Sequence, residues 1–354
     1  MSSRQLPFLD VSAPALVQAD RYPHLRYMGS KYRLLPTLAS VFEEVGGKTA
    51  LDPFSGSGVV SYLLKALGYA VTSRDYLNFP VTLAKAACAN QGQRLSDEDV
   101  RLIVDGGNRD GRDFISRTYD GLFFTPEDLR FLDAAWSHID RLAGSKRHLA
   151  VAALVLAAAR KQPRGVFTVT GLRYDDGRAW LHTPLSEQFV ACVDAWNSAV
   201  FEGEHCLAAQ GDVSAAPTNA DLVYLDPPYA PPRDDNDYLK RYWFLEGLSD
   251  YWQGGTAAVM KGTTTRKLPK RPTAFGSKRT IVSALVAMFE QFRDSTIVLS
   301  YGSNAVPDLE ALVGMLRDVK GGAPEVVELP HRYHFGTHSR AARREAVEYV
   351  VVAR

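Results

Sequence analysis

The sequence has little of several features that define other classes of protein. Its three cysteines, Cys88, Cys192 and Cys206, lie far apart in 354 residues, which argues against a disulfide framework and a zinc cluster. No apolar run is long enough to span a bilayer, and no charged-then-apolar signal begins the chain. We therefore expect a cytoplasmic protein without a membrane partner. The net charge of +1 does not by itself indicate a nucleic-acid partner.

What is present is typical of a globular enzyme. The chain is 46% hydrophobic and 23% charged, and 354 residues are enough for a large core and about two domains. Ser96 and Thr125 precede acidic residues and apolar runs, which predicts helices that begin directly after them. The apolar run 149–159 predicts a core helix.

The most informative segment is the tetrapeptide 226–229, Asp-Pro-Pro-Tyr, which follows the apolar run 222–225. That run predicts a buried strand, so the tetrapeptide lies at a strand end. The Asp226 carboxylate and the Pro227 carbonyl can accept hydrogen bonds, and Tyr229 offers an aromatic face for stacking. These groups suit methylation of an exocyclic amine on a planar base, because accepting both N–H groups localises the amine's lone pair. A turn at an edge strand is the alternative.

A second motif is the glycine-rich turn 52–58, Asp-Pro-Phe-Ser-Gly-Ser-Gly, between a predicted strand at 49–51 and a predicted helix at 59–67. Glycines let a ligand approach the backbone closely, and such a turn is the usual nucleotide-binding corner of a doubly wound sheet. No Gly-Lys-Ser/Thr follows, so the turn is not a phosphate-binding P-loop, and the dinucleotide fingerprint is absent. An ordinary turn is the alternative.

Together with Tyr27-Met28-Gly29-Ser30-Lys31, these motifs resemble the alpha class of amino-methyltransferases, the Dam-type N6-adenine-specific DNA methyltransferases that use S-adenosylmethionine. Ser30 stands where that family usually has a second glycine. The resemblance covers 22–88 and 207–354 and is much weaker across 89–206. It implies an α/β fold, a doubly wound, mostly parallel Rossmann-like sheet built from the first two ranges. The segment 89–206 would be an inserted helical and hairpin target-recognition domain, and 1–21 an N-terminal arm.

The resemblance also implies roles for individual residues. Asp75, which follows the predicted strand 70–73, is the candidate for the ribose hydroxyls of the cofactor, and Asp212 for its adenine amine. The target amine would be held by Asp226, Pro227, Pro228 and Tyr229. The full set of expected cofactor-binding residues is Tyr27, Gly29, Ser30, Lys31, Asp52, Pro53, Phe54, Gly56, Gly58, Asp75 and Asp212.

Clusters of basic residues indicate where DNA would bind. The segment 261–279 holds seven lysines and arginines and no acidic residue, and from it we expect Lys267, Lys270 and Arg271 to contact phosphates. Arg160, Lys161 and Arg164 begin a further cluster. The runs 165–170 and 179–182, with a turn at 175–178, predict a hairpin. On it we expect Arg164, Phe167 and Arg173 to contact nucleic acid; a purely structural hairpin is the alternative.

Three histidines, His331, His334 and His338, have a spacing that suits a metal. Gly336 and Thr337 would break a helix there, however, and the methyl transfer described requires no metal. We therefore predict no metal site.

These observations predict an enzyme that methylates the 6-amino group of adenine in double-stranded DNA at a specific sequence, after the base is flipped out of the duplex. One alternative is a methyltransferase that acts on RNA adenine or on the cytosine amine of DNA. Another is a nucleic-acid-binding protein that keeps the fold without the chemistry. The sequence does not distinguish a stand-alone enzyme from the modification partner of a restriction endonuclease.

Overall fold

The computed structural model describes residues 13–162, 165–168, 170, 177–228, 237–253, 258–332 and 345–354. Its strands are β1 Thr49–Asp52, β2 Ala70–Asp75, β3 Leu207–Gln210, β4 Leu222–Leu225, β5 Thr296–Gly302, β6 Glu325–Arg332 and β7 Glu345–Ala353. Its helices include α1 Ala13–Ala19, α2 Leu35–Val45, α3 Val59–Ala66, α4 Asn78–Ala87, α5 Asp97–Asp105, α6 Phe114–Thr118, α7 Pro126–Ile139, α8 Gly144–Arg160, α9 Ala179–His182, α10 Leu185–Ala199, α11 Tyr238–Leu248, α12 Ile281–Gln291 and α13 Leu309–Lys320. Short 3-10 turns are η1 Tyr32–Leu34, η3 Val213–Ala215 and η5 Ala274–Gly276.

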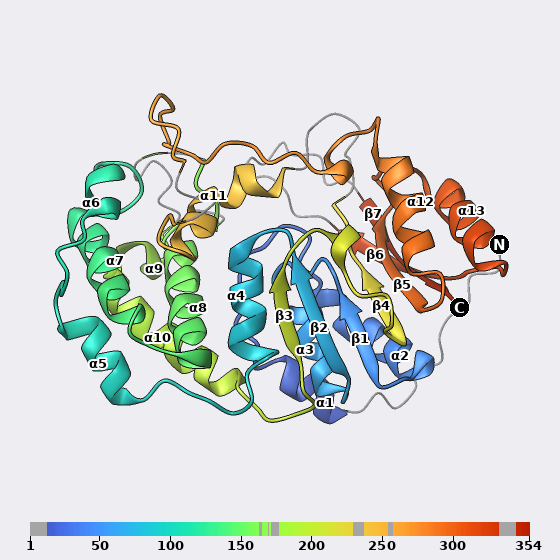
Figure 1. The fold of residues 1–354 in the computed structure, drawn as a ribbon, viewed down its shortest axis with the longest axis horizontal. Helices are drawn as coiled ribbons and strands as arrows, with labels where there is room; N and C mark the ends of the chain where they lie inside the picture. Colours follow the sequence, from blue (N-terminus) through green and yellow to red (C-terminus); the bar gives the residue numbers. More distant parts are fainter. Residues whose placement is uncertain are drawn as a thin grey trace.

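The strands form one sheet of order β3-β2-β1-β4-β5-β7-β6. β3, β2, β1, β4 and β5 are parallel, whereas β7 runs antiparallel to both β5 and β6. The direction in which the sheet grows reverses between β1 and β4. In open α/β sheets the crevice at the carboxyl ends of two such strands is the usual ligand site. The mostly parallel α/β sheet predicted from the sequence is thus confirmed (Figure 1).

The two faces of the sheet are buried by different helices. Ala50, Tyr224 and Val298 belong to a core that includes side chains of α2, α3 and α4. Their neighbours along the strands, such as Leu51 and Val223, belong to a second core with side chains of α12 and α13. Successive strand residues point to opposite faces, so short, wholly apolar strands such as β4 supply both cores.

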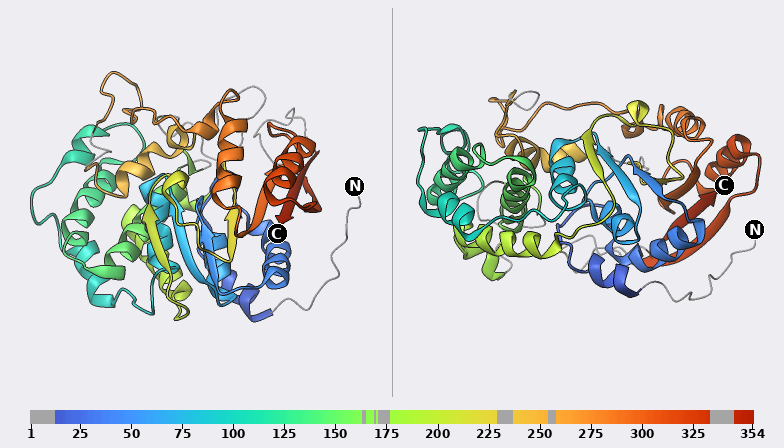
Figure 2. Two further views of the ribbon diagram at one scale, coloured as in Figure 1. Left: turned by 45° about the vertical axis from the view of Figure 1, so that its right-hand side comes forward. Right: turned by 60° about the horizontal axis from the view of Figure 1, so that its bottom comes forward.

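The helices of 97–199 gather at one end of the molecule, beside the sheet edge formed by β3 (Figures 1 and 2). α8 packs against α4, which in turn contacts β2 and β3. The expected core helix at 149–159 is confirmed as the C-terminal two thirds of α8, and all of those residues are buried. The expected helix starts are also confirmed, because the side chains of Ser96 and Thr125 cap α5 and α7.

Two local predictions, the hairpin and the N-terminal arm, need correction. The predicted hairpin is wrong where the structure can be compared with it, since 165–168 are not in a strand and 179–182 form α9. The side chain of Gln188 donates to the Trp180 carbonyl at 2.6 Å, so this backbone oxygen is bonded without a strand partner. The expected arm at 1–21 contains α1, in which Ala15 and Ala19 are buried; residues 1–12 are outside the described part.

Lys161 is also not the surface cation that the sequence suggested. It is 8% exposed, and its ammonium lies 2.7 Å from the Asp128 carboxylate at the start of α7. Asp128 in addition accepts the backbone N–H of Leu185, at the start of α10. This buried pair therefore joins the helices α7, α8 and α10.

Among the described residues no helix has the length and apolarity needed to cross a membrane.

We expect Lys161→Met to lower the free energy of unfolding by about 3 kcal/mol, because it leaves the buried Asp128 without its counter-charge. The matched control is Arg130→Met, which breaks the exposed pair of Arg130 with Glu127 on α7 and should leave the free energy of unfolding nearly unchanged. Urea unfolding of the two variants measures both values. Equal losses of unfolding free energy would mean that the Lys161–Asp128 pair stabilises the fold no more than the exposed pair does.

Candidate functional site

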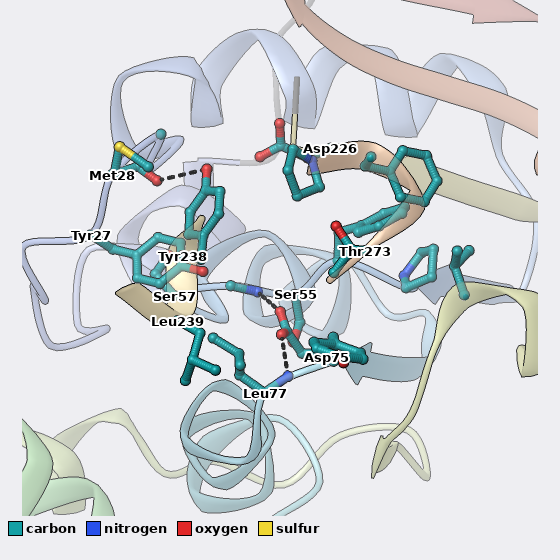
Figure 3. Close-up of a pocket in the computed structure, with 18 of the residues that line it drawn as sticks. Tyr27, Met28, Ser55, Ser57, Asp75, Leu77, Asp226, Tyr238, Leu239 and Thr273 are labelled. Carbon is teal, nitrogen blue, oxygen red and sulfur yellow. Dashed lines mark hydrogen bonds between the residues drawn. The ribbon is translucent and has the colours of Figure 1, made fainter. Parts of the chain in front are cut away.

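A pocket of about 300 Å³ lies at the carboxyl ends of β1 and β4, where the order of the strands reverses. This is within the size range of small-molecule sites. Its remaining walls come from residues 27–31, from 75–77, from the start of α11 and from the segment 270–277 (Figure 3). The sequence-predicted residues that line it are Tyr27, Gly29, Ser30, Lys31, Asp52, Pro53, Phe54, Gly56, Asp75, Asp212, Asp226, Pro228, Lys270 and Arg271.

An ion pair connects the segment 27–31 to Asp226, which directly follows β4. The ammonium of Lys31 lies 2.7 Å from Oδ2 of Asp226, and it also donates to the Gly29 carbonyl at 2.7 Å. Burial raises the pKa of the Asp226 carboxyl above its usual value, and the Lys31 charge opposes that rise. Burial alone would lower the pKa of Lys31, but Asp226 and Glu348 raise it overall. The short distance is that of a charge-assisted hydrogen bond, so Lys31 holds Asp226 as an oriented acceptor.

Two further carboxylates line the pocket from the ends of the neighbouring strands β1 and β2. Asp75 at the end of β2 accepts the backbone N–H groups of Gly56 and Leu77, each at 2.9 Å (Figure 3). Asp52 at the end of β1 accepts the hydroxyl of Ser61 at 2.6 Å. Burial raises the pKa of Asp52 to about 7 and that of Asp75 to about 6. The site thus keeps acceptors in an environment that disfavours their charge, which is typical of functional carboxylates.

Stacked tyrosines form one wall of the pocket. The ring of Tyr27 is stacked on Tyr242 with centroids 4.9 Å apart, and it lies 5.5 Å from the ring of Tyr238. Gly56 has φ +49°, and a Cβ built there would be 2.9 Å from Cε1 of Tyr27. A side chain at position 56 would therefore push into this wall, which explains the need for glycine in the turn.

Some predicted residues lie outside the pocket lining. Gly58 has φ +83° at the start of α3, where a Cβ would meet the Tyr22 hydroxyl at 2.4 Å, so its constraint is one of packing. Pro227 is buried beside the pocket, and only its backbone remains a candidate for contact. Lys267, three residues before Lys270 in the basic segment, does not line the pocket.

The predicted DNA contact of Phe167 is wrong. Its side chain is 0% exposed, and its ring stacks on Phe244 of α11 at a centroid distance of 4.5 Å. An aromatic residue beside basic residues is typical of a nucleic-acid-binding surface, whereas here the ring completes an aromatic core. Tyr229, Arg164 and Arg173 lie outside the described residues.

Sequence reasoning missed several residues of the site. Tyr238 and Leu239 enter the pocket from the first turn of α11, and Phe275 packs edge-on against Phe54 at 5.4 Å. Asp237 caps α11 by accepting the N–H of Lys240, so this residue could have signalled a helix start. No local pattern indicates that this helix returns to the glycine corner.

The structure bears only partly on the question of a metal. Among the described residues, no group of three histidine, cysteine, aspartate or glutamate side chains could hold a metal ion. His334 and His338 fall outside the described ranges, so the expected lack of a metal stays a prediction.

Comparisons with known proteins show similarity to DNA methyltransferases. The family profile of the D12 class N6 adenine-specific DNA methyltransferases matches residues 27–105. The chain is 28% identical over 331 residues to the Type II methyltransferase M2.HphI of Haemophilus parahaemolyticus, covering 88% of this chain and 93% of that protein. It is 21% identical over 339 residues to the modification methylase LlaI of Lactococcus lactis subsp. lactis, covering 91% of this chain but 53% of that protein.

The raised pKa of Asp52 predicts that ionisation of this carboxyl lowers the free energy of unfolding. Because its folded-state pKa of about 7 exceeds the ordinary 3.8, the contribution of Asp52 to stability is fully present below about pH 4 and is lost as pH rises through 7. Asp52→Asn should therefore match the wild type near pH 4 and exceed it at pH 8 by up to about 4 kcal/mol. Urea unfolding between pH 4 and 8 tests this, with Asp318→Asn on the surface of α13 as the control. A difference that stays constant with pH would contradict it.

Proposed function

We propose that this chain, in which residues 27–105 match the profile of the D12 class N6 adenine-specific DNA methyltransferases, methylates the exocyclic amine of adenine in double-stranded DNA, using S-adenosylmethionine. The observation that carries this proposal is the single pocket that joins the glycine corner at 52–58 to Asp226. A donor bound at the corner and an acceptor base bound at Asp226 would share that space. Alignment of two bound reactants can lower a barrier by about 7–11 kcal/mol.

The chemistry of the lining supports S-adenosylmethionine as the cofactor. In the described part of the chain, Oδ1 of Asp52 and the hydroxyls of Ser30 and Ser55 are buried without a hydrogen-bond partner, and all three residues line the pocket. Buried polar groups are normally satisfied, so these atoms fit a polar ligand with several donors. Asp75 is the candidate for the ribose hydroxyls and Asp212 for the adenine amine. When bound, the cofactor supplies an electrophilic methyl group on a positively charged sulfur.

Asp226 would then act on the target amine. An aromatic amine is a poor nucleophile because its lone pair is delocalised into the ring. Hydrogen bonds from its two N–H groups to the Asp226 carboxylate and the Pro227 carbonyl would localise that pair on nitrogen. Asp226 and the Pro227 carbonyl would thus present the nitrogen to the methyl group that the cofactor supplies, with the cofactor's sulfur as the leaving group, and the surplus proton would pass from the nitrogen to the Asp226 carboxylate or to water. Lys31 keeps Asp226 oriented for this task.

The target base lies inside a duplex and must be flipped out, at a cost of a few kcal/mol. Stacking on Tyr229 would offset about 1–3 kcal/mol of that cost. Lys267, Lys270 and Arg271 remain candidates for phosphate contacts, as do Arg164 and Arg173. We assign catalysis to 22–88 and 207–354 and recognition of the target sequence to 89–206.

The relatives' names, Type II methyltransferase and modification methylase, support a role in a restriction–modification system. In such a system a cognate restriction endonuclease is the functional partner. The segment 89–206 would then determine which sequence is protected.

The proposed function is tested by expressing the chain in a host that lacks DNA methylation and sequencing the genomic DNA for modified bases. We expect N6-methyladenine at one recurring sequence. Assays of the purified protein on single-stranded RNA and on cytosine-containing duplexes separate the alternative substrates. Binding of S-adenosylmethionine without transfer to any nucleic acid would instead indicate a binding protein.

We expect Asp226→Ala to lower turnover by at least about 10²–10³-fold, because the acceptor that orients the amine is lost. The dissociation constant for S-adenosylmethionine should stay within a few-fold, since Asp52 and Asp75 are unchanged. Calorimetry and single-turnover methylation measure the two quantities. Near-normal turnover would show that Asp226 does not have the role assigned here.

Gly56→Ala should weaken binding of S-adenosylmethionine by about 10-fold, because the new Cβ displaces Tyr27 from the pocket wall. The matched control is Gly111→Ala, at φ +72° with no atom within 4 Å of the built Cβ. Both substitutions strain the backbone by about 1 kcal/mol, but only the first intrudes on the site. Equal cofactor affinities for the two variants would contradict the assignment of the glycine corner.

A further inference from the structure

Glu246 is a buried carboxylate of α11 that the described mechanism does not use. Its side chain is 0% exposed. One oxygen, Oε2, accepts the backbone N–H groups of Asn78 at 2.8 Å and Phe79 at 3.1 Å, the first two residues of α4. The residue in the N-cap position of α4, Leu77, provides no side-chain cap. Glu246 therefore caps α4 from a distant helix, where a negative charge also complements the helix dipole.

This contact is one residue away from the pocket. The N–H of Leu77 donates to Asp75, while the next two N–H groups donate to Glu246. Three successive backbone donors are thus shared between a carboxylate inside the pocket and one behind it. The position of Asp75 depends on how α4 begins, and α4 begins where Glu246 holds it.

The other oxygen of Glu246 connects to the basic segment. Oε1 lies 3.2 Å from Nη1 of Arg271, whose side chain is 25% exposed. Arg271 and its neighbours through Ser277 form a wall of the same pocket. Burial raises the pKa of Glu246 to about 7, and Arg271 is among the groups that oppose this rise. Arg271 thus supplies a counter-charge to a carboxylate that is otherwise costly to bury.

We propose that Glu246 is a positioning residue that couples the cofactor side of the pocket to the wall 270–277 through its pair with Arg271. When the wall 270–277 is held in place by this pair, the affinity for S-adenosylmethionine is higher, and bound cofactor in turn stabilises the wall in that position. The coupling joins the glycine-corner side of the site to a segment that is expected to contact DNA. This inference rests on the proposed function, because it takes Asp75 as a cofactor contact.

The test is a double-mutant cycle of Glu246→Gln and Arg271→Met, with the dissociation constant for S-adenosylmethionine measured by calorimetry. We expect each single variant to raise it by roughly 10-fold, and the double variant by no more than either one alone. Arg271→Lys, which keeps the charge, should recover most of the affinity. For Glu246→Gln at saturating cofactor, kcat should change by less than about 3-fold, so that KM for the cofactor carries the effect.

The control is Arg279→Met, an exposed arginine of the same basic segment, which should leave cofactor affinity unchanged. Additive effects in the cycle, or an equal effect of Arg279→Met, would overturn the inference. If Glu246→Gln fails to fold, the contrast of Arg271→Met with Arg271→Lys and Arg279→Met decides. A wild-type chain that does not bind S-adenosylmethionine would defeat the proposed function instead, which keeps the two failures distinct.

Discussion

The reversal of strand order between β1 and β4 is the constraint on which the site depends. Where the strand order reverses, the segments that follow the two neighbouring strands lead to opposite faces of the sheet. This leaves a crevice at the carboxyl ends of those strands. β1 ends at Asp52, and Asp226 directly follows β4. A register with Leu51 opposite Val223 brings both ends to the same edge. Two motifs that are far apart in the sequence thus become one pocket.

The pocket concentrates negative groups where they are least stable. Asp52, Asp75 and Asp226 in the pocket, and Glu246 directly behind it, all have a pKa raised chiefly by burial. Their environments are not alike, however. Asp226 and Glu246 each contact a cation, whereas Asp52 and Asp75 accept hydrogen bonds from neutral donors. A positively charged sulfonium ligand would supply the missing counter-charge to the second pair, which is the electrostatic argument for S-adenosylmethionine at this corner.

Local patterns were enough to predict much of this arrangement. The strand before Asp226, the glycine turn after β1 and the capped starts of α5 and α7 each depend on a few adjacent residues, so the sequence alone indicated them. Glu246 and Tyr238 could not be found in this way. Their roles arise from the return of α11 to the start of α4 and to the glycine corner, and no short-range signal encodes that contact.

The same limit explains the errors at Phe167 and Lys161. Aromatic and basic side chains in a row resemble a nucleic-acid surface, and only tertiary packing shows whether they face solvent. Phe167 stacks on Phe244, and Lys161 pairs with Asp128. A residue's type thus restricts what it can contact, whereas its exposure is decided by segments elsewhere in the chain.

The burial of Phe167 also bears on how the helical part could recognise DNA. Trp243 of α11 donates its indole N–H to the Phe167 carbonyl at 3.0 Å, and Tyr119 packs edge-on against Phe244 at 5.1 Å. Residues of the segment proposed for recognition therefore share one continuous apolar core with the helix that carries Tyr238 into the pocket. Swinging that segment away as a rigid body would expose this core to water, at about 25 cal/mol for each Å². Recognition is thus better served by surface loops on a fixed scaffold, with the movement left to the DNA base that must enter the pocket.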